Sequence, residues 1–386
     1  MRTGWETIAT NFGRNDKPYG GGAFRVNGNE IISLKLVGPQ LKFKPASEAK
    51  DPDVAEPTEE WMNDTAELLN RGTVSFLRGS LDTGLTRTFQ QRGQNAAWWY
   101  SKDWRTVYIS TGWMDYKASK ASNELLPQRT KLWRSSDGGQ TWSQLHWPED
   151  AEIEQLLFLD PQRGYAIGWG PHVWRTTDAG RSWQEVKLPP LANVGGPHKT
   201  FDAVNLGPDG VLRVAYYVDE LGGLKTSTLV YRLGWSESDF EQDVVLPNQI
   251  VVDLQSSPQT TGGYSLYALS KLGPPHNIDN VADDGRRTGA LSTWGSARPA
   301  KMQQLQHTFD QRLMFDGLSV GKDGVLLVYA TDASGDGAPR DLTFLSKNSG
   351  KSWEELNDGA AQGGYFDPET NTQYALFAYT LKKRRF

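Results

Sequence analysis

An eight-residue pattern occurs three times in this chain and constrains the fold more than any other feature. The copies are 135–142 (SSDGGQTW), 176–183 (TTDAGRSW) and 346–353 (SKNSGKSW). They share the frame hydroxyl-x-Asp/Asn-x-Gly-x-hydroxyl-Trp, in which the short carboxylate or amide accepts hydrogen bonds from N–H groups of its own turn. The glycine supplies the positive φ that such a turn needs. The pattern therefore predicts tight turns between β-strands, each closed by its tryptophan.

Degenerate copies extend the pattern into a longer repeat. Residues 80–86 (SLDTGLT) keep the frame but are followed by Arg87 where the tryptophan should be, and Phe240 falls at the closing position of a further, decayed copy. The closing positions are 87, 142, 183, 240 and 353. The separation between successive positions has the length of one propeller blade, except the last, which covers two blades. One blade, near 289–306, has lost its turn. The repeat by itself therefore predicts six blades.

The two ends of the chain supply a seventh blade. Residues 4–8 (GWETI) read like the strand that follows each turn, but no inner strands precede them. Residues 364–367 and 372–381 read as strands with no outer strand after them. Joining the two ends removes exposed sheet edges. We therefore expect an all-β chain that forms a single β-propeller domain over 1–386, with seven blades and both termini in one blade, and with six blades as the alternative.

Composition limits the class of protein. Fifteen tryptophans and 40 glycines among 386 residues suit a chain of many strands and tight turns. The formal charge of −5 argues against a general nucleic-acid binder, and the lack of cysteine excludes disulfides and thiolate metal sites. No apolar run is long enough to span a membrane. Because residues 1–10 hold no hydrophobic signal core, we expect a periplasmic or otherwise extracytoplasmic protein whose signal or lipid anchor has been removed, with a cytoplasmic protein as the alternative.

Residues 164–183 resemble the repeat of the photosystem II assembly-factor (stability/assembly) family. This chain has Gly-Tyr-Ala-Ile-Gly at 164–168, where that family has a Gly-aromatic-Ala-Val-Gly strand, and the turn ending at Trp183 follows as it does there. The same turn, called an Asp-box or BNR repeat, occurs in sialidases and in sorting-receptor propellers. The resemblance implies a propeller that holds another protein during biogenesis, with the box residues in structural roles. These residues are Asp82, Asp137, Asp178, Asn348, Trp142, Trp183 and Trp353.

Signals of catalysis are weak. Residues 317–321 (GLSVG) match the letters of a hydrolase nucleophile elbow, but Ser319 lies in a strand-like stretch followed by a hairpin turn, where the elbow needs a strand-to-helix turn. Residues 332–337 resemble the start of a calcium loop whose twelfth position, Thr343, is not the required glutamate. The five histidines show no metal-ligand spacing. We therefore expect no catalytic residue, no metal and no cofactor.

A sialidase-like glycoside hydrolase is the alternative function that the boxes suggest. The resemblance to sialidases implies three arginines that hold the substrate carboxylate, a Tyr–Glu pair and an Asp acid/base. Arg25 is the nearest match to the first arginine, although its segment lacks the proline of the sialidase motif. Fold does not imply function, and the rival interpretation is that Arg25 is an ordinary strand residue.

Five insertions all fall in one type of connection, between the second (b) and third (c) strands of a blade. They are 38–72, 114–130, 220–225, 272–288 and 332–341. The boxes lie in connections between the third and fourth (d) strands, which are at the opposite end of a blade. Loops on a rigid scaffold commonly carry binding. The sequence therefore predicts that a partner binds at the end that carries the b–c connections.

The first insertion is acidic, with eight acidic residues and one lysine between Glu48 and Glu67. Within it, 57–70 reads as a short amphipathic helix. We expect this segment to dock a basic surface of a partner protein, and a solvated loop is the rival interpretation. The protein, a monomer when free, would act as an assembly factor, or as an inhibitor or immunity protein of the bacterial periplasm. The predicted partner-binding residues are Glu56, Glu59, Glu60, Trp61, Tyr116, His276 and Asp279.

Overall fold

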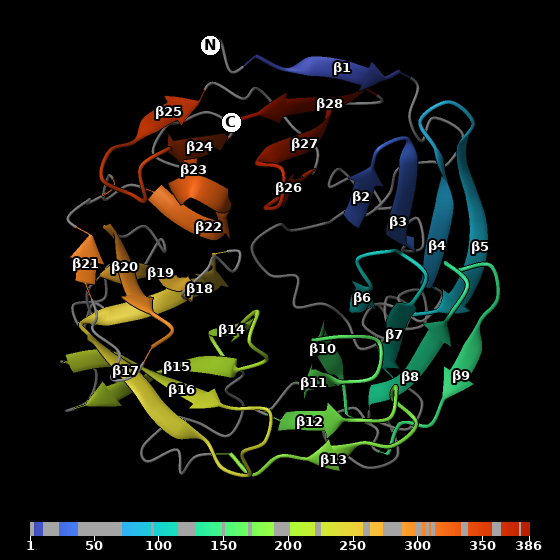
Figure 1. The fold of residues 1–386 in the computed structure, drawn as a ribbon, viewed down its shortest axis with the longest axis horizontal. Helices are drawn as coiled ribbons and strands as arrows, with labels where there is room; N and C mark the ends of the chain where they lie inside the picture. Colours follow the sequence, from blue (N-terminus) through green and yellow to red (C-terminus); the bar gives the residue numbers. More distant parts are fainter. Residues whose placement is uncertain are drawn as a thin grey trace, which may run out of the picture. The chain divides into compact units, whose positions relative to one another are not determined.

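The described part of the chain is almost entirely β-structure. The computed structural model describes residues 4–10, 23–37, 72–93, 96–114, 128–148, 151–168, 172–188, 201–220, 225–257, 263–272, 288–297, 303–305, 309, 313–332, 339–356, 364–377 and 380–386. Within these residues, seven four-stranded sheets form, and the one helical element is a 3₁₀ turn at Lys322–Gly324. The chain is a seven-bladed β-propeller, as the repeat and the two chain ends predict (Figure 1).

Two compact units divide the blades, and the first holds three of them. This three-blade unit comprises Asn11–Trp169 and Trp174–Gln184. Each blade is an antiparallel sheet whose strands we call a to d. Blade 1 is β2 (Ala23–Asn27), β3 (Glu30–Val37), β4 (Thr73–Ser80) and β5 (Gly84–Arg92); blade 2 is β6 (Trp98–Tyr100), β7 (Val107–Met114), β8 (Gln128–Ser135) and β9 (Ser143–Leu145); blade 3 is β10 (Ile153–Phe158), β11 (Gly164–Gly168), β12 (His172–Thr176) and β13 (Gln184–Glu185).

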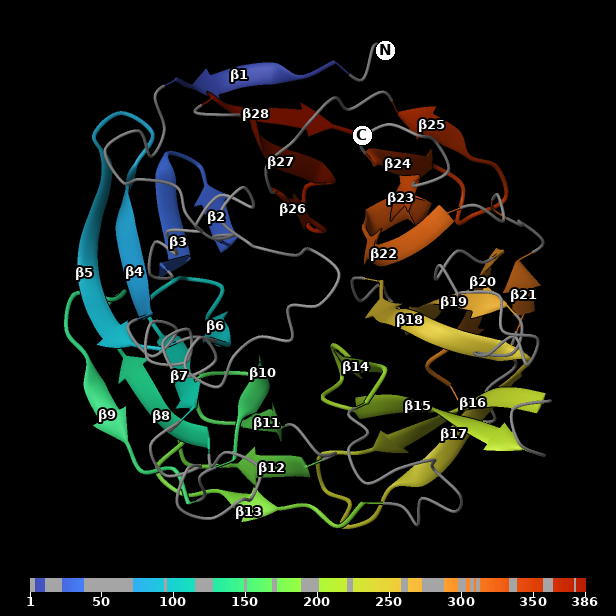
Figure 2. The ribbon, with the colours of Figure 1, turned by 180° about the vertical axis from the view of Figure 1, so that it is seen from behind.

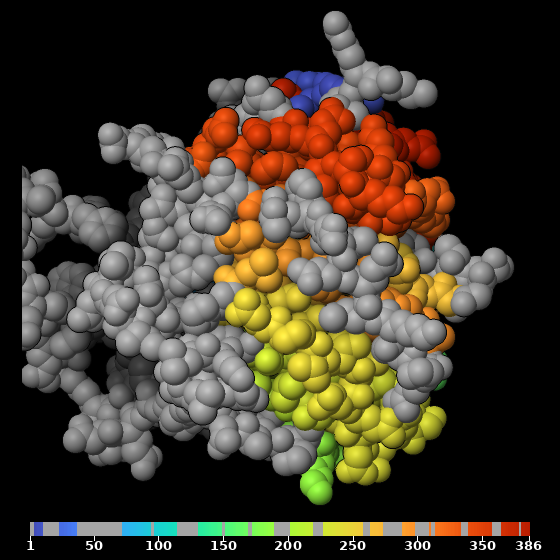
Figure 3. Space-filling view, turned by 90° about the vertical axis from the view of Figure 1, so that its left-hand side faces the viewer, coloured from blue at the N-terminus to red at the C-terminus, as the bar shows by residue number. Residues whose placement is uncertain are grey.

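The four-blade unit comprises Met1–Thr10, Gly170–Val173 and Glu185–Phe386. Blade 4 is β14 (Ala203–Leu206), β15 (Leu212–Glu220), β16 (Lys225–Leu233) and β17 (Glu241–Pro247); blade 5 is β18 (Gln249–Ser256), β19 (Ser265–Leu272), β20 (Gly289–Gly295) and β21 (Gln303–Leu305); blade 6 is β22 (Leu313–Val320), β23 (Leu326–Asp332), β24 (Arg340–Ser346) and β25 (Glu354–Leu356). Blade 7 is β26 (Gly364–Asp367), β27 (Thr372–Phe377) and β28 (Thr380–Arg385), completed by β1 (Glu6–Ala9). Figures 1 and 2 show the a strands on one side of this unit and the d strands on the other, and Figure 3 faces the part of that second side that carries β17, β21 and β25.

Aromatic and aliphatic side chains fill the space between neighbouring blades within each unit. In the three-blade unit, Phe76 of blade 1 contacts Trp98 and Trp142 of blade 2. In the four-blade unit, Phe309 contacts Trp353 of blade 6. Because middle strands are covered on both faces, they lose the alternation of buried and exposed residues that a one-sided strand shows; all five residues of β11 are buried.

Both chain ends share blade 7, which confirms the prediction made from 4–8 and the C-terminal strands. β1 pairs antiparallel with β28, and the Trp5 ring packs edge-on against Phe377. The prediction that 372–381 forms one strand is wrong, because β27 ends at Phe377 and β28 begins at Thr380. The reversal gives blade 7 its fourth strand, since β27 pairs with β28 and β28 with β1. The reversal is hidden in the sequence because 372–381 contains none of the Gly, Pro, Asn or Asp residues that mark turns.

The insertions lie where the repeat predicts them. Each of the five falls at the connection between the b and c strands of a blade, although 114–130 and 332–341 extend past it, because β8 begins at Gln128 and β24 at Arg340. Ser319 lies inside β22, ahead of the turn at Lys322–Gly324, so its surroundings are not those of a nucleophile elbow. In the described part of the chain, no helix has the length and apolar character needed to cross a membrane.

Candidate binding surface at the blade ends

The box turns hold the hydrogen bonds that their sequence predicts. Asp137 accepts from the N–H of Thr141 at 2.9 Å and from its hydroxyl at 2.5 Å. These bonds, the side-chain one foremost, lower the pKa of Asp137 to about 2, so that the carboxylate remains an acceptor at neutral pH. Asp178 and Asn348 make the equivalent bond to the N–H of the residue four positions on, at 2.9 Å in both turns. In each turn, therefore, a side chain of the box accepts a hydrogen bond from a backbone N–H of the same turn.

The first hydroxyl of each box has a role that the sequence analysis missed. Ser135 Oγ accepts from the buried N–H of Gly139 at 2.7 Å, and Thr176 and Ser346 make the same contact with Gly180 and Gly350. In contrast, the N–H groups that donate to Asp137 are exposed. Water can replace the carboxylate at an exposed N–H but not at a buried one. The frame itself indicates this role of the first hydroxyl, because its first position is always Ser or Thr.

We expect Ser135→Ala to destabilise the protein more than Asp137→Ala does. Ser135→Ala leaves a buried N–H without an acceptor, which costs about 1–3 kcal/mol. Asp137→Ala removes bonds that water can replace, for a loss of about 1 kcal/mol. Urea unfolding of the two variants measures the difference. An equal or reversed order would show that the carboxylate is the main support of the turn, and Ser143→Ala, which removes an exposed hydroxyl bond to Arg134 O, is the matched control.

The fourth box departs from the expected geometry. β4 and β5 remain paired up to Ser80 and Gly84, so only three residues form the turn. Asp82 accepts from the side-chain amide of Asn29, in the β2–β3 turn, at 2.7 Å. Ser80 Oγ accepts from the N–H of Thr83 instead. Without a closing tryptophan there is no ring to place against the neighbouring blade, and the turn contracts into a tight hairpin.

The closing tryptophans attach each box to a neighbouring core. Trp142 donates its ring N–H to Gly139 O at 2.9 Å and packs on Phe89 of blade 1. Trp353 makes the same bond to Gly350 O at 3.1 Å. Trp183 packs against Trp147 in the three-blade unit. These contacts give the rings a structural role.

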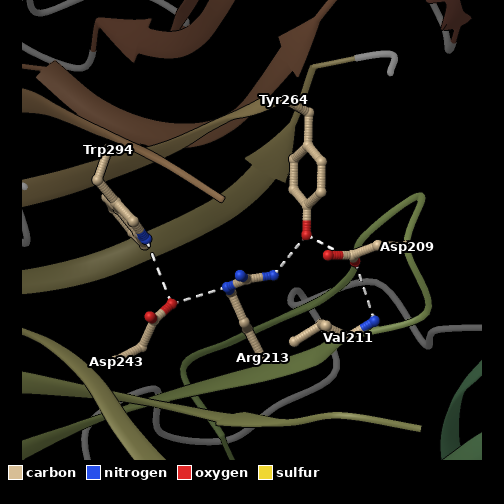
Figure 4. A network of polar contacts seen from close by, with 6 residues as sticks. All are labelled: Asp209, Val211, Arg213, Asp243, Tyr264 and Trp294. Carbon is tan, nitrogen blue, oxygen red and sulfur yellow. Dashed lines mark hydrogen bonds and ion pairs between the residues drawn. The ribbon is translucent and has the colours of Figure 1, made fainter. Parts of the chain in front are cut away.

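A buried polar network takes the place of a box between blades 4 and 5 (Figure 4). Arg213 of β15 donates to Asp243 of β17 and to the Tyr264 hydroxyl, both at 2.8 Å. Tyr264 in turn donates to Asp209 at 2.7 Å, and Trp294 donates to Asp243 at 3.3 Å. Burial raises the pKa of Tyr264 to about 12, so the hydroxyl keeps the proton that it donates. The network ties two blades together in the absence of a closing tryptophan.

Arg25 joins the first strands of blades 1 and 2. Its Nε donates to the hydroxyl of Tyr100 at 2.7 Å, and Nη1 donates to Phe24 O. The guanidinium also lies 5.5 Å from the centre of the Trp98 ring. These contacts give Arg25 a structural role in β2. Among the residues that the structure describes, no group of three or more His, Asp or Glu side chains could hold a metal ion.

One surface at the b–c end of the three-blade unit brings two cations to one indole ring. Trp113 lies at the end of β7, and Lys131 of β8 is its diagonal neighbour, because Trp113 pairs with Arg129 and Thr111 with Lys131. Lys131 Nζ is 5.4 Å from the centre of the Trp113 ring, and Arg92 Cζ, at the end of β5, is 5.8 Å from it. Arg92 is exposed, whereas Trp113 and Lys131 are half-buried. We call Arg92, Trp113 and Lys131 the Trp113 patch.

The Trp113 patch cannot be recognised in the sequence, because its members come from three strands and two blades. The spacing of residues 92, 113 and 131 follows no motif. The b–c connection of blade 2 was the only pointer to it, since β7 and β8 flank that connection. The predicted partner-binding residues Glu56, Glu59, Glu60, Trp61, Tyr116, His276 and Asp279 lie outside the described residues, as does the helix expected over 57–70.

The sequence matches no protein-family model, and no curated protein matches it. Among solved structures, the chain is similar to YCF48 bound to D1 peptide, with 11% identity, a TM-score of 0.51, and coverage of 99% of this chain and 95% of that one. YCF48 from Cyanidioschyzon merolae matches with 12% identity, a TM-score of 0.47, and coverage of 95% and 98%. The GH74 xyloglucanase from Xanthomonas campestris matches with 13% identity and a TM-score of 0.53, over 99% of this chain and 53% of the xyloglucanase.

The two similarities with TM-scores above 0.5 establish the fold. YCF48 is a photosystem II assembly factor, so the predicted resemblance to assembly-factor propellers is confirmed at the level of the fold. An assembly factor and a xyloglucanase match about equally well, with TM-scores of 0.51 and 0.53. Because one fold serves both proteins, the choice between binding and catalysis has to come from the chain's own residues.

Proposed function

We propose that this protein is a non-catalytic propeller that binds a segment of another protein at the b–c end of its blades, as an assembly factor does. The observation that carries the proposal is the Trp113 patch, where a half-buried indole and two cations meet at the junction of blades 1 and 2. Tryptophan and arginine are the residue types most enriched among energetically dominant contacts. At the opposite end of blade 2, by contrast, the polar groups of the box turn bond either within the turn or to neighbouring segments, such as Arg78 of blade 1, which donates to Gly138 O.

The comparison with YCF48 supports a protein partner, because that propeller was solved with a bound peptide. An inhibitor or immunity role would use the same surface, but no described residue favours it over an assembly role. Docking of a basic partner surface on the acidic insertion, and a location outside the cytoplasm, remain proposals. No specific observation favours a glycoside hydrolase, since Arg25 is held by Tyr100 and Phe24 and the similarity to the xyloglucanase concerns the fold.

Site-specific photocrosslinking tests the proposed face. A benzoylphenylalanine at Gln90, an exposed residue two positions before Arg92, should give an adduct of one discrete mass in cells that naturally make the protein. The matched control is the same replacement at Gln140, an exposed residue of the blade 2 box. Adducts from position 140 but not from position 90 would move the binding face to the box end. Equal melting temperatures of the two variants would exclude unfolding as the cause.

A further inference from the structure

The outer strand of blade 7 is joined to its sheet differently from the other outer strands. In the six other blades, strand d follows strand c directly along the chain, whereas β1 and β28 come from opposite ends of the sequence. Figures 1 and 2 show β1 alongside β28, as the outermost strand of the blade. A short connection keeps a strand at a high effective concentration beside its neighbour. Because no such connection joins β1 to β28, a strand from another molecule can compete for its place.

The pairing of β1 with β28 is short. Glu6 pairs with Lys383 and Thr7 with Lys382, and the register shifts after the second pair. Such a shift disrupts the ladder of backbone hydrogen bonds. The side chains of Glu6 and Thr7 are exposed, so they bury little apolar surface. Segments with few buried contacts and exposed hydrogen bonds open most readily, and β1 meets this description.

The ring of Trp5 is the largest side chain that this segment places on blade 7. Its centre lies 5.1 Å from that of the Phe377 ring and 4.3 Å from the guanidinium carbon of Arg384. Among the described residues, the buried ring N–H of Trp5 has no hydrogen-bond partner. A buried donor without an acceptor is unfavourable, so it weakens the hold of blade 7 on this segment. We call Phe377, Lys382, Lys383 and Arg384 the β28 slot.

The charge of β28 exceeds the opposite charge of β1. β28 has four consecutive basic residues, at 382–385, and β1 offers one carboxylate, that of Glu6, 3.6 Å from Lys383. The residue paired with Lys382 is the neutral Thr7. Opposite charges at directly paired positions stabilise neighbouring antiparallel strands. A strand with carboxylates at both positions would therefore pair with β28 more favourably than β1 does.

We infer that an extended segment of a partner protein displaces β1 and binds in the β28 slot. The segment has an aromatic residue followed by two acidic residues. Its ring takes the place of Trp5, and its two carboxylates lie opposite Lys383 and Lys382. Consecutive side chains of a strand point to opposite faces; the two lysines are also consecutive, so each carboxylate meets its own lysine. This site goes beyond the proposed function, because it uses the outer edge of blade 7 instead of the b–c end of the blades.

Fluorescence anisotropy with the full chain tests the displacement. The probe is fluorescein-labelled Gly-Trp-Glu-Glu-Ile-Ala, which is the sequence of residues 4–9 with glutamate in place of the threonine. The control probes are Gly-Ala-Glu-Glu-Ile-Ala and Gly-Trp-Lys-Lys-Ile-Ala. Trp5→Ala should bind the probe roughly tenfold more tightly than wild type does, because apparent affinity rises with the fraction of protein whose site is vacant. Equal affinity of Trp5→Ala for the probe and for both controls would overturn the inference.

A second destabilised variant separates displacement from general loosening of the fold. Asp243→Ala breaks a buried ion pair with Arg213, in blade 4, and leaves β1 and β28 unchanged. It should bind the probe no more tightly than wild type does. An equal gain of affinity in Asp243→Ala and Trp5→Ala would show that the probe binds loosened protein, and it would overturn the inference.

Replacements of Thr7 test the competition without removing the indole. Thr7→Lys places a like charge opposite Lys382 at an exposed position, so β1 should yield to the probe and affinity should rise about twofold. Thr7→Glu should strengthen β1 and lower the affinity for the probe by about the same factor. Affinity that shifts in the same direction in both variants, or in neither, would show that β1 does not compete with the probe.

Disulfide trapping locates the bound peptide. The chain has no cysteine, so Lys382→Cys gives a single thiol at the position that pairs with Thr7. The peptide has cysteine, as a thiopyridyl disulfide, in place of its second glutamate, and it should form an adduct with this thiol in the Trp5→Ala background. Lys347→Cys, at an exposed position of the blade 6 box, is the matched control. Equal adduct yields at the two positions would place the peptide elsewhere and overturn the assignment to β28.

The β1 strand of a second copy of this chain is the rival occupant. Sedimentation velocity should show monomers for both wild type and Trp5→Ala. A wild-type dimer that Trp5→Ala abolishes would assign the β28 slot to a second copy and would overturn the partner segment.

Discussion

Asp243→Ala should lower the free energy of unfolding by about 3–5 kcal/mol, the cost of breaking a buried ion pair. The side chains of Arg213 and Asp243 are 1% and 6% exposed, and 2.8 Å separates Nε from Oδ2. Removing the carboxylate leaves the buried guanidinium with its bond to the neutral Tyr264 hydroxyl, and Trp294 loses its acceptor. Urea unfolding followed by tryptophan fluorescence measures the loss.

Two further variants make this result specific. Asp239→Ala removes an exposed carboxylate that bonds Ser238, and it should change stability by no more than about 0.5 kcal/mol. The double replacement Arg213→Met with Asp243→Leu should recover much of the loss, because a well-packed apolar pair can replace a buried ion pair at little net cost. A loss below about 1 kcal/mol for Asp243→Ala would show that water or a neighbouring group compensates the guanidinium.

Trp5→Ala should have the second-largest effect, a loss of about 3 kcal/mol. The Trp5 ring lies 4.3 Å from the guanidinium carbon of Arg384 and 5.1 Å from the ring of Phe377. Arg384 is only 4% exposed and is held by Gln373 at 2.7 Å. Without the indole, the buried guanidinium loses its cover and β1 loses its anchor on β28. Thermal unfolding and amide hydrogen exchange of β28 measure both effects.

The same blade supplies the controls. Glu6→Gln breaks an exposed ion pair with Lys383 at 3.6 Å and should cost less than about 1 kcal/mol. Trp5→Phe should cost less than Trp5→Ala, because phenylalanine keeps an aromatic ring at this position and, among the described residues, the buried ring N–H of Trp5 has no hydrogen-bond partner to lose. Deletion of residues 1–10 should lower the melting temperature at least as much as Trp5→Ala. If the deletion left the melting temperature unchanged, β1 would contribute nothing to the blade that both termini share.

Hydrogen bonds between residues close in the sequence explain which parts of the fold the sequence predicts. The polar partners within a box lie within four residues of one another, such as Asp137 and Thr141. The frame therefore specifies the turn wherever all its members are present. The prediction weakened where members were missing. Asp82 binds Asn29, 53 positions away, and its turn contracts. The reversal between Phe377 and Thr380 carried no turn residue and was missed.

The amino-acid sequence by itself predicted the box turns, the shared terminal blade and the position of the insertions, and it favoured seven blades over six. Each of these features depends on a repeated local pattern or on the tendency of an exposed sheet edge to pair with another strand. Only the tertiary structure decided that Arg213 meets Tyr264, 51 residues away, and that Arg92 and Lys131 border Trp113. These contacts join strands of different blades, or different strands of one blade. Which side chains meet there is set by strand register and blade packing, and a linear spacing of residues records neither.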